Sequence, residues 1–124
     1  ASATGITNLA NWALAECDKP SLLREGEVSA KTVFDAVKEG DELAKEIAER
    51  FGKYLGTALA NITTIVDPQA IVIGGGVSKA GPILLEYIEK YYQKYCFKSC
   101  KDVNFTLATL GNDAGIFGCA KLML

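Results

Sequence analysis

The stretch that most constrains the fold is a short apolar run that leads into three consecutive glycines. Residues 70–73 are Ala-Ile-Val-Ile, with Pro68 before them and Gly74, Gly75 and Gly76 after them. A continuous apolar, mostly β-branched run between such breaks is typical of a strand that is buried on both faces, as in the parallel sheets of α/β proteins. The stretch therefore predicts an α/β fold with this strand inside its sheet.

Helical and strand patterns alternate through the rest of the chain. Apolar residues three and four apart predict helices, Ser29 and Asp41 are expected N-caps, and Pro68 ends the longest helix. The predicted helices cover residues 6–16, 29–37, 42–66 and 82–95, a second strand covers 103–110, and Asp113 caps a last helix to about residue 123. This order predicts one domain over residues 1–124, with a largely parallel sheet flanked by helices.

The predicted helix over residues 42–66 carries two kinds of surface. Small residues at Gly52, Gly56 and Ala60 lie four apart on one side, where another backbone could pack closely in the core. The broad apolar face consists of Leu43, Ile47, Phe51, Tyr54, Leu55, Ala58, Leu59, Ile62 and Ile65.

Composition excludes several classes of protein. The 124 residues are 49% hydrophobic with a net charge of -2, and the lysines are scattered among acidic residues, so we expect no nucleic-acid partner. No apolar run reaches the roughly 20 residues of a membrane span, and residues 1–7 do not resemble a signal peptide. We expect no membrane association and a cytoplasmic location. Because the chain starts at Ala1 without a methionine, we also expect a fragment or a processed product.

The cysteines and acidic residues indicate no metal site or catalytic group. Without any histidine, the four cysteines, Cys17, Cys96, Cys100 and Cys119, fall short of a zinc site and are expected to be reduced thiols. The acidic side chains are expected to be solvated charges on polar helix faces, chiefly Glu39, Asp41, Glu42, Glu46, Glu49, Glu86 and Glu89. We assign no catalytic residue.

The glycine triplet is the candidate ligand site. Glycines at the carboxyl end of a buried strand expose the backbone where open α/β sheets bind ligands. A tight turn with positive φ explains the triplet equally well, and the stretch is neither a Walker loop nor a complete dinucleotide fingerprint. A second strand-to-helix turn, Leu-Gly-Asn-Asp-Ala-Gly over residues 110–115, is explained most simply by helix capping at Asp113.

Taken together, these motifs resemble the ROK family of sugar kinases and sugar-responsive repressors. The resemblance rests on the glycine stretch over 71–78, the turn over 110–115 and the helix end Asn-Ile-Thr-Thr-Ile-Val-Asp-Pro over 61–68, and it covers essentially the whole chain. Cys119 stands where alanine is more usual. The resemblance implies the C-terminal half of an actin-like ATPase, which has a ribonuclease H-like fold, without its N-terminal half.

The resemblance also implies a nucleotide site. Gly74, Gly75 and Gly76 would form the adenosine loop, with Val77 and Ser78 opening the following helix beside the nucleoside of ATP or ADP. The phosphate loop, the catalytic aspartate, the Mg²⁺ site, most sugar contacts and the zinc motif of the family would all lie upstream of this chain. The isolated chain is therefore expected to be inactive.

Two classes of parent protein remain open. The favoured one is an ATP-dependent hexokinase of the glucokinase type that makes glucose 6-phosphate, with kinases of fructose, mannose or amino sugars as alternatives. The other is the sugar-sensing half of a ROK transcriptional repressor. The large apolar helix faces further predict a homo-oligomer.

Overall fold

The computed structural model describes residues 3–108, and the predicted alternation of elements is confirmed there. The elements follow in the order α1 (Ala3–Glu16), η1 (Leu22–Glu25), α2 (Ala30–Lys38), α3 (Glu42–Val66), β1 (Ala70–Ile73), η2 (Gly76–Ala80), α4 (Ile83–Tyr95), η3 (Lys98–Cys100) and β2 (Asn104–Leu107). The η elements are short 3₁₀ helices. The expected helix after Asp113 lies outside the described residues.

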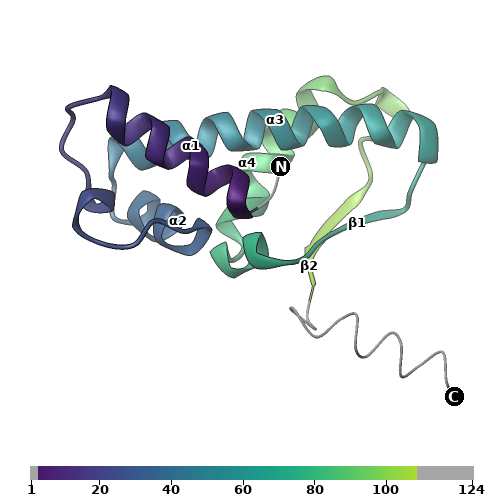
Figure 1. Cartoon of the computed structure of the whole chain (residues 1–124). Coiled ribbons are helices and arrows are strands. Elements are labelled where there is room, and N and C mark those ends of the chain that lie inside the picture. The colour runs from purple at the N-terminus through teal and green to yellow at the C-terminus, as the bar shows by residue number, and fades with distance from the viewer. Residues whose placement is uncertain (1–2, 109–124) are drawn as a thin grey trace, which may run out of the picture.

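The two strands form a parallel pair, as predicted for an α/β fold. Ile71 lies opposite Phe105 and Ile73 lies opposite Leu107 in the register. Helix α4 connects the strands, so β1, α4 and β2 form a βαβ unit. Figure 1 shows both strands side by side below the long helix α3. Their carboxyl ends lie at the same edge of the sheet.

The helix boundaries follow from local hydrogen bonds that the sequence predicts. The Ser29 side chain accepts a hydrogen bond from Thr32 N, and the Thr32 hydroxyl accepts one from Ser29 N at 2.7 Å, which makes a capping box. The Asp41 carboxylate accepts the Ala44 N–H at 3.0 Å and caps α3. At the other end Asp67 adopts a left-handed φ of 50° directly before Pro68, and α3 stops there.

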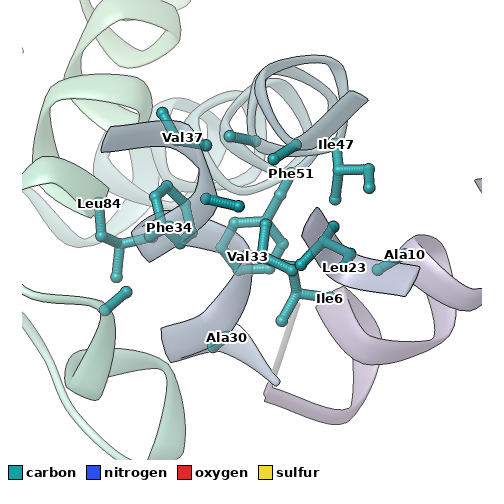
Figure 2. Packing of buried hydrophobic residues seen from close by; sticks show 14 of the residues in the cluster. Ile6, Ala10, Leu23, Ala30, Val33, Phe34, Val37, Ile47, Phe51 and Leu84 are labelled. Carbon is teal, nitrogen blue, oxygen red and sulfur yellow. The ribbon is translucent and has the colours of Figure 1, made fainter. Parts of the chain in front are cut away.

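The main core lies between α1, α2, the first half of α3, η2 and the start of α4. Its members are large apolar side chains that are almost fully buried, and Figure 2 shows several of them converging. They include Ile6, Val33, Phe34, Ile47, Phe51 and Leu84. The helices are amphipathic in sequence because they bury one side each in this cluster.

The small residues of α3 bring the backbone of α4 close, as predicted. A Cβ atom added at Gly52 would lie 2.6 Å from the Tyr87 carbonyl oxygen, and one added at Gly56 would lie 2.6 Å from that of Ile88. Real Cβ contacts are never this short, so only glycine permits the observed separation. Ala60 continues the same contact surface and is buried.

Burial is one-sided on α3 and β1, and the expectation that the strand is buried on both faces is wrong. In the second half of α3 the predicted apolar face is largely exposed, since Tyr54 is 70% and Ile65 is 86% exposed, while the opposite, small-residue side is buried. Strand β1 is buried on one face only: Ile71 is buried but Val72 is 60% exposed. The reason in both cases is that the described elements, α4 and β2 above all, pack on one side and none of them covers the other.

Candidate functional site

The candidate site begins where the two strands end. The ladder continues past β2 through a hydrogen bond of 2.8 Å from Ala108 N to the Ile73 carbonyl oxygen. Gly74 follows at once, and a Cβ atom there would lie 3.3 Å from the Ala108 Cβ, a tighter contact than most proteins show. The absence of a side chain at Gly74 therefore lets the two strand ends lie close together.

Gly75 gives the turn its shape. Its φ of 77° lies in the region that side-chain-bearing residues rarely adopt, and a Cβ atom there would meet nothing within 4 Å. Gly75 is therefore required by its backbone conformation, and its Cα faces open space. The Ser78 N–H and hydroxyl both donate to the Gly75 carbonyl oxygen, at 3.1 and 2.6 Å, and close the turn.

The segment after the triplet differs from the expected opening of a helix. Residues Gly76–Ala80 form the 3₁₀ helix η2, and Gly81, with φ of 84°, separates it from α4. Val77 and Ala80 are buried in the main core, 6% and 3% exposed. Because the Val77 side chain is buried, a ligand could contact only the backbone of this residue. The Ser78 hydroxyl is already hydrogen-bonded to the Gly75 carbonyl oxygen within the turn.

An open hollow of about 340 Å³ lies directly beside this turn. Gly76 and Lys79 line it from η2, and the facing wall comes from the first turns of two helices. That wall consists of Thr4 and Thr7 from α1 and of Ser29, Ala30 and Lys31 at the start of α2. Three elements that are distant in sequence thus meet around the end of the glycine turn.

The lining suits an anionic or hydroxyl-rich ligand. Lys31 and Lys79 bring two positive charges, the three hydroxyl residues bring hydrogen-bonding groups, and the start of α2 adds the positive end of a helix dipole. Among the described residues that line the hollow there is no carboxylate. The described lining therefore suits the binding of a ligand through positive charges and hydroxyl groups.

Of the seven described residues that line the hollow, only Gly76 was a predicted site residue. The signal for Lys79 was present, because it follows the glycine triplet within the same turn. Lys31 lies two residues after the expected cap Ser29, in the first helical turn. Thr4 and Thr7 gave no such signal, because only the tertiary contact of α1 brings them to the hollow.

Two of the acidic side chains that were counted as solvated charges have structural roles: Asp41, which was also an expected N-cap, and Glu49. Burial alone would raise the pKa of Asp41, but hydrogen bonds from Ala44, Ser21 and Leu22 outweigh it and lower the pKa. Burial likewise opposes the lowered pKa of Glu49, which results from hydrogen bonds donated by Lys90 and Tyr91. The Lys90 ammonium lies 2.7 Å from the Glu49 carboxylate, which joins α4 to α3.

The described residues contain neither a cluster of metal-binding side chains nor a helix that could span a membrane. Between residues 3 and 108 no three or more His, Cys, Asp or Glu residues are placed so that together they could hold a metal ion. Cys17, Cys96 and Cys100 are free thiols, and Cys119 lies outside the described part. None of the helices described is both long and apolar enough for a membrane span.

Comparisons with known proteins show sugar kinases that are similar to this chain. The glucokinase of Halalkalibacterium halodurans is 41% identical over 123 residues, covering 95% of this chain and 37% of the relative. A crystal structure of a ROK family glucokinase from Streptomyces griseus, in complex with glucose and AMPPNP, matches with a TM-score of 0.83 at 25% identity, covering 96% of this chain and 41% of that one.

A regulator is also similar. The crystal structure of a ROK family transcriptional regulator, a homologue of the E. coli MLC protein, matches with a TM-score of 0.70 at 28% identity, covering 86% of this chain and 27% of that one. The chain thus spans less than half the length of each of these proteins. The model of the ROK family matches residues 1–124, and the chain belongs to that family, with the actin-like fold of its sugar kinases.

Proposed function

We propose that this chain is the nucleotide-binding part of an ATP-dependent hexose kinase, with glucose as the favoured sugar. The observation that carries the proposal is the hollow at the glycine turn, where Lys31 and Lys79 lie beside exposed backbone. Its volume of about 340 Å³ is within the range of small-molecule pockets. The sugar is favoured because the relative with 41% identity is a glucokinase.

The groups present fit a nucleoside better than a reacting phosphate. The backbone at Gly74–Gly76 offers a surface without side chains, on which a flat base or a ribose can lie. The two lysines and the start of α2 would attract the phosphates of ATP or ADP. Phosphoryl transfer further needs Mg²⁺ and a base for the sugar hydroxyl, and we expect segments outside this chain to supply them.

The second candidate is the ligand-sensing part of a ROK repressor. The observation that favours it is the similarity to a solved ROK regulator at 28% identity. The kinase proposal predicts hexose-dependent formation of ADP by the longer protein that contains this chain, whereas the repressor would form none. A coupled assay with ATP and glucose, then with fructose, mannose and amino sugars, decides between the two and identifies the sugar.

Nucleotide binding to the chain itself is measured by calorimetry with ATP and ADP. We expect weak binding that Gly75→Val abolishes, because a branched side chain is strained at a φ of 77° and would change the turn. Lys79→Ala should weaken binding about tenfold through loss of one charge-assisted contact. Gly26→Val is the matched control, because that glycine has open space and no positive φ.

Two results would contradict this assignment. Undiminished ATP binding by a folded Lys79→Ala and a folded Gly75→Val variant would locate the nucleotide elsewhere. Failure of the longer protein, wild type and folded, to bind ATP or ADP would remove the nucleotide function altogether.

A further inference from the structure

A groove between α1 and α3 lies apart from the glycine turn. Its volume of about 170 Å³ is half that of the hollow beside Gly76, and no described lining residue is common to both. Thr4 and Thr7, near the start of α1, line the hollow, whereas the second half of the same helix lines the groove. Figure 1 shows α1 alongside the first half of α3. The chain therefore carries a second candidate ligand site, which we call the α1–α3 groove.

The floor of the groove is apolar and belongs to the packed core. Leu43 and Ile47 from α3 are only 2% and 1% exposed, and Leu9 and Ala13 from α1 pack against the same core. All four side chains are aliphatic and form no hydrogen bonds, so they favour an apolar group of a ligand. Because core residues form this floor, it is already in place before a ligand binds.

One end of the groove is cationic and aromatic. The Arg50 guanidinium lies 5.2 Å from the centre of the Trp12 ring, and both residues line the groove. Trp12 is half-exposed, and Arg50 is exposed and forms no ion pair with another described residue. A guanidinium that lies on an indole face in this way still has N–H groups free to bind a carboxylate.

The other end of the groove is acidic. Glu16 follows Trp12 by one turn of α1, and Glu46 precedes Arg50 by one turn of α3. The Lys19 ammonium lies 2.8 Å from the Glu46 carboxylate and neutralises it. Glu16 is exposed and forms no ion pair with another described residue. One unpaired negative charge thus lies a helical turn, a rise of about 6 Å, along the groove from one unpaired positive charge.

We infer that the α1–α3 groove binds a small aliphatic α-amino acid, of which L-leucine is the test case. The carboxylate of the ligand would bind Arg50, its ammonium would bind Glu16, and its side chain would lie on the apolar floor beside Trp12. A zwitterion is favoured because the groove offers one unpaired charge of each sign, and a ligand with a single charge would leave one of them without a partner. Binding in this groove does not depend on the proposed nucleotide site.

Two other classes of ligand fit the groove less well. A phosphorylated ligand would bring additional negative charge beside Glu16 and Glu46. A free sugar would place hydroxyl groups against the aliphatic floor, which cannot form hydrogen bonds with them. The charges and the floor of the groove thus favour an amino acid over a nucleotide or a sugar.

Trp12, the only tryptophan in the sequence, provides a direct readout of binding. Titration of the 124-residue chain with L-leucine at pH 7 should give a saturable change in tryptophan emission, because the ligand displaces water from the indole ring. We expect a dissociation constant of about 1 mM, since so small a ligand makes few contacts. The absence of saturable binding up to about 20 mM, in both fluorescence and calorimetry, would overturn the inference.

Analogues of leucine test the two charges and the side chain separately. Leucinamide lacks the carboxylate, 4-methylpentanoate lacks the ammonium, and glycine lacks the apolar side chain. Each should bind about tenfold more weakly than leucine in calorimetry, because each loses one of the three proposed contacts. Binding of leucinamide or 4-methylpentanoate as tight as that of leucine would contradict recognition of a zwitterion.

Substitution of Arg50 tests the carboxylate contact. Arg50→Gln should weaken leucine binding about tenfold and leave leucinamide binding within about twofold, because leucinamide has no carboxylate for Arg50 to bind. Lys53→Gln removes the same charge at an exposed position of α3 outside the groove and should leave leucine binding unchanged. Undiminished binding by Arg50→Gln, or equal weakening by both variants, each folded by circular dichroism, would overturn the inference.

Cys17 tests the position of the ligand independently. This free thiol lines the groove, whereas the free thiol of Cys96 lies at the end of α4, outside it. Saturating leucine should slow alkylation of Cys17 by iodoacetamide about threefold or more, because the ligand restricts access, and should leave Cys96 unaffected. Mass spectrometry of the digested chain measures both rates. An unchanged rate at Cys17 in the presence of bound leucine would locate the ligand elsewhere and overturn the inference.

Discussion

The two halves of α3 are buried in opposite ways. The first half buries large side chains such as Ile47 and Phe51 beneath α1 and α2. From Gly52 onward the helix buries Gly52, Gly56 and Ala60 against α4 and exposes its large apolar side chains, of which Ile65 is 86% exposed. Large side chains thus fill the space between helices along the first part of α3. Along its second part, small residues let the backbone of α4 come close.

The difference shows what determines each contact. Where side chains separate two helices, their volume and burial supply the stabilisation, at about 25 cal/mol per Å² of apolar surface. Where backbones approach as closely as α3 and α4 do at Gly52 and Gly56, dispersion contacts along both main chains supply it, and any added atom is repelled. A hydrophobic pattern reveals the first kind of contact and is silent about the second.

Truncating one isoleucine in each half gives the largest expected contrast. Ile47→Ala should lower the free energy of unfolding by about 3–4 kcal/mol, because Ile47 is 1% exposed and its loss leaves a cavity. Ile65→Ala should change it by about 0.5 kcal/mol or less. Urea unfolding followed by circular dichroism measures both.

Equal losses of unfolding free energy in Ile47→Ala and Ile65→Ala would contradict the difference in burial between the two halves of α3. A loss of more than about 2 kcal/mol in Ile65→Ala would mean that the second half also buries its large side chains in solution. The urea m-value provides a check, since it should not change if both variants unfold from equally compact native states.

Adding one methyl group where α3 and α4 approach at glycine should have a smaller effect on stability. The cause is crowding of the contact, whereas truncating Ile47 leaves a cavity. Gly56→Ala should destabilise the chain by about 2 kcal/mol, since the new Cβ would lie 2.6 Å from the Ile88 carbonyl oxygen and force the helices apart. In an exposed helix the same substitution stabilises by about 1 kcal/mol. The sign of the change in urea midpoint therefore tests the close approach directly.

Gly26→Ala is the control for that substitution. A Cβ atom at Gly26 would meet nothing within 4 Å, and its φ of -163° is open to any residue. We expect a change within about 0.5 kcal/mol. A stabilised Gly56→Ala variant would show that α3 and α4 lie farther apart than described.

The sequence predicted the elements whose signals are local. Ser29 and Asp41 bond to backbone groups within three residues, Pro68 acts on the residue before it, and the apolar run over 70–73 forms its strand. The small residues at Gly52 and Gly56 also predicted a close contact. Each of these outcomes depends on neighbours along the chain or along one helix face.

The features that the sequence did not predict depend on residues that are distant from them along the chain. The exposure of Val72 depends on which side of β1 the neighbouring elements cover, and hydrophobicity alone does not encode that choice. The strand-end glycines were found, but the far wall of the hollow, with Thr4 and Lys31, was not, because α1 and α2 reach it only through the packed core. A sequence motif thus located one side of the candidate site.

The smallest expected effect on stability concerns Asp41, the N-cap of α3. The Asp41 carboxylate accepts hydrogen bonds from Ala44 N, Leu22 N and the Ser21 hydroxyl, so it both caps α3 and holds η1 against it. Asp41→Ala should cost about 1–2 kcal/mol at pH 7, measured by urea unfolding, whereas Asp41→Asn keeps one oxygen acceptor and should cost less.

The pH dependence separates the charge of Asp41 from its shape. Because folding lowers the pKa of this carboxyl, its charge stabilises the fold fully above the ordinary carboxyl value of about 4, and that contribution is lost as pH falls through the lowered pKa. The difference in unfolding free energy between wild type and Asp41→Asn should therefore be largest near neutral pH and shrink below pH of about 4. A difference that stays constant from pH 7 to pH 3 would mean that hydrogen-bond geometry alone, without charge, fixes the start of the half of α3 that carries the main core.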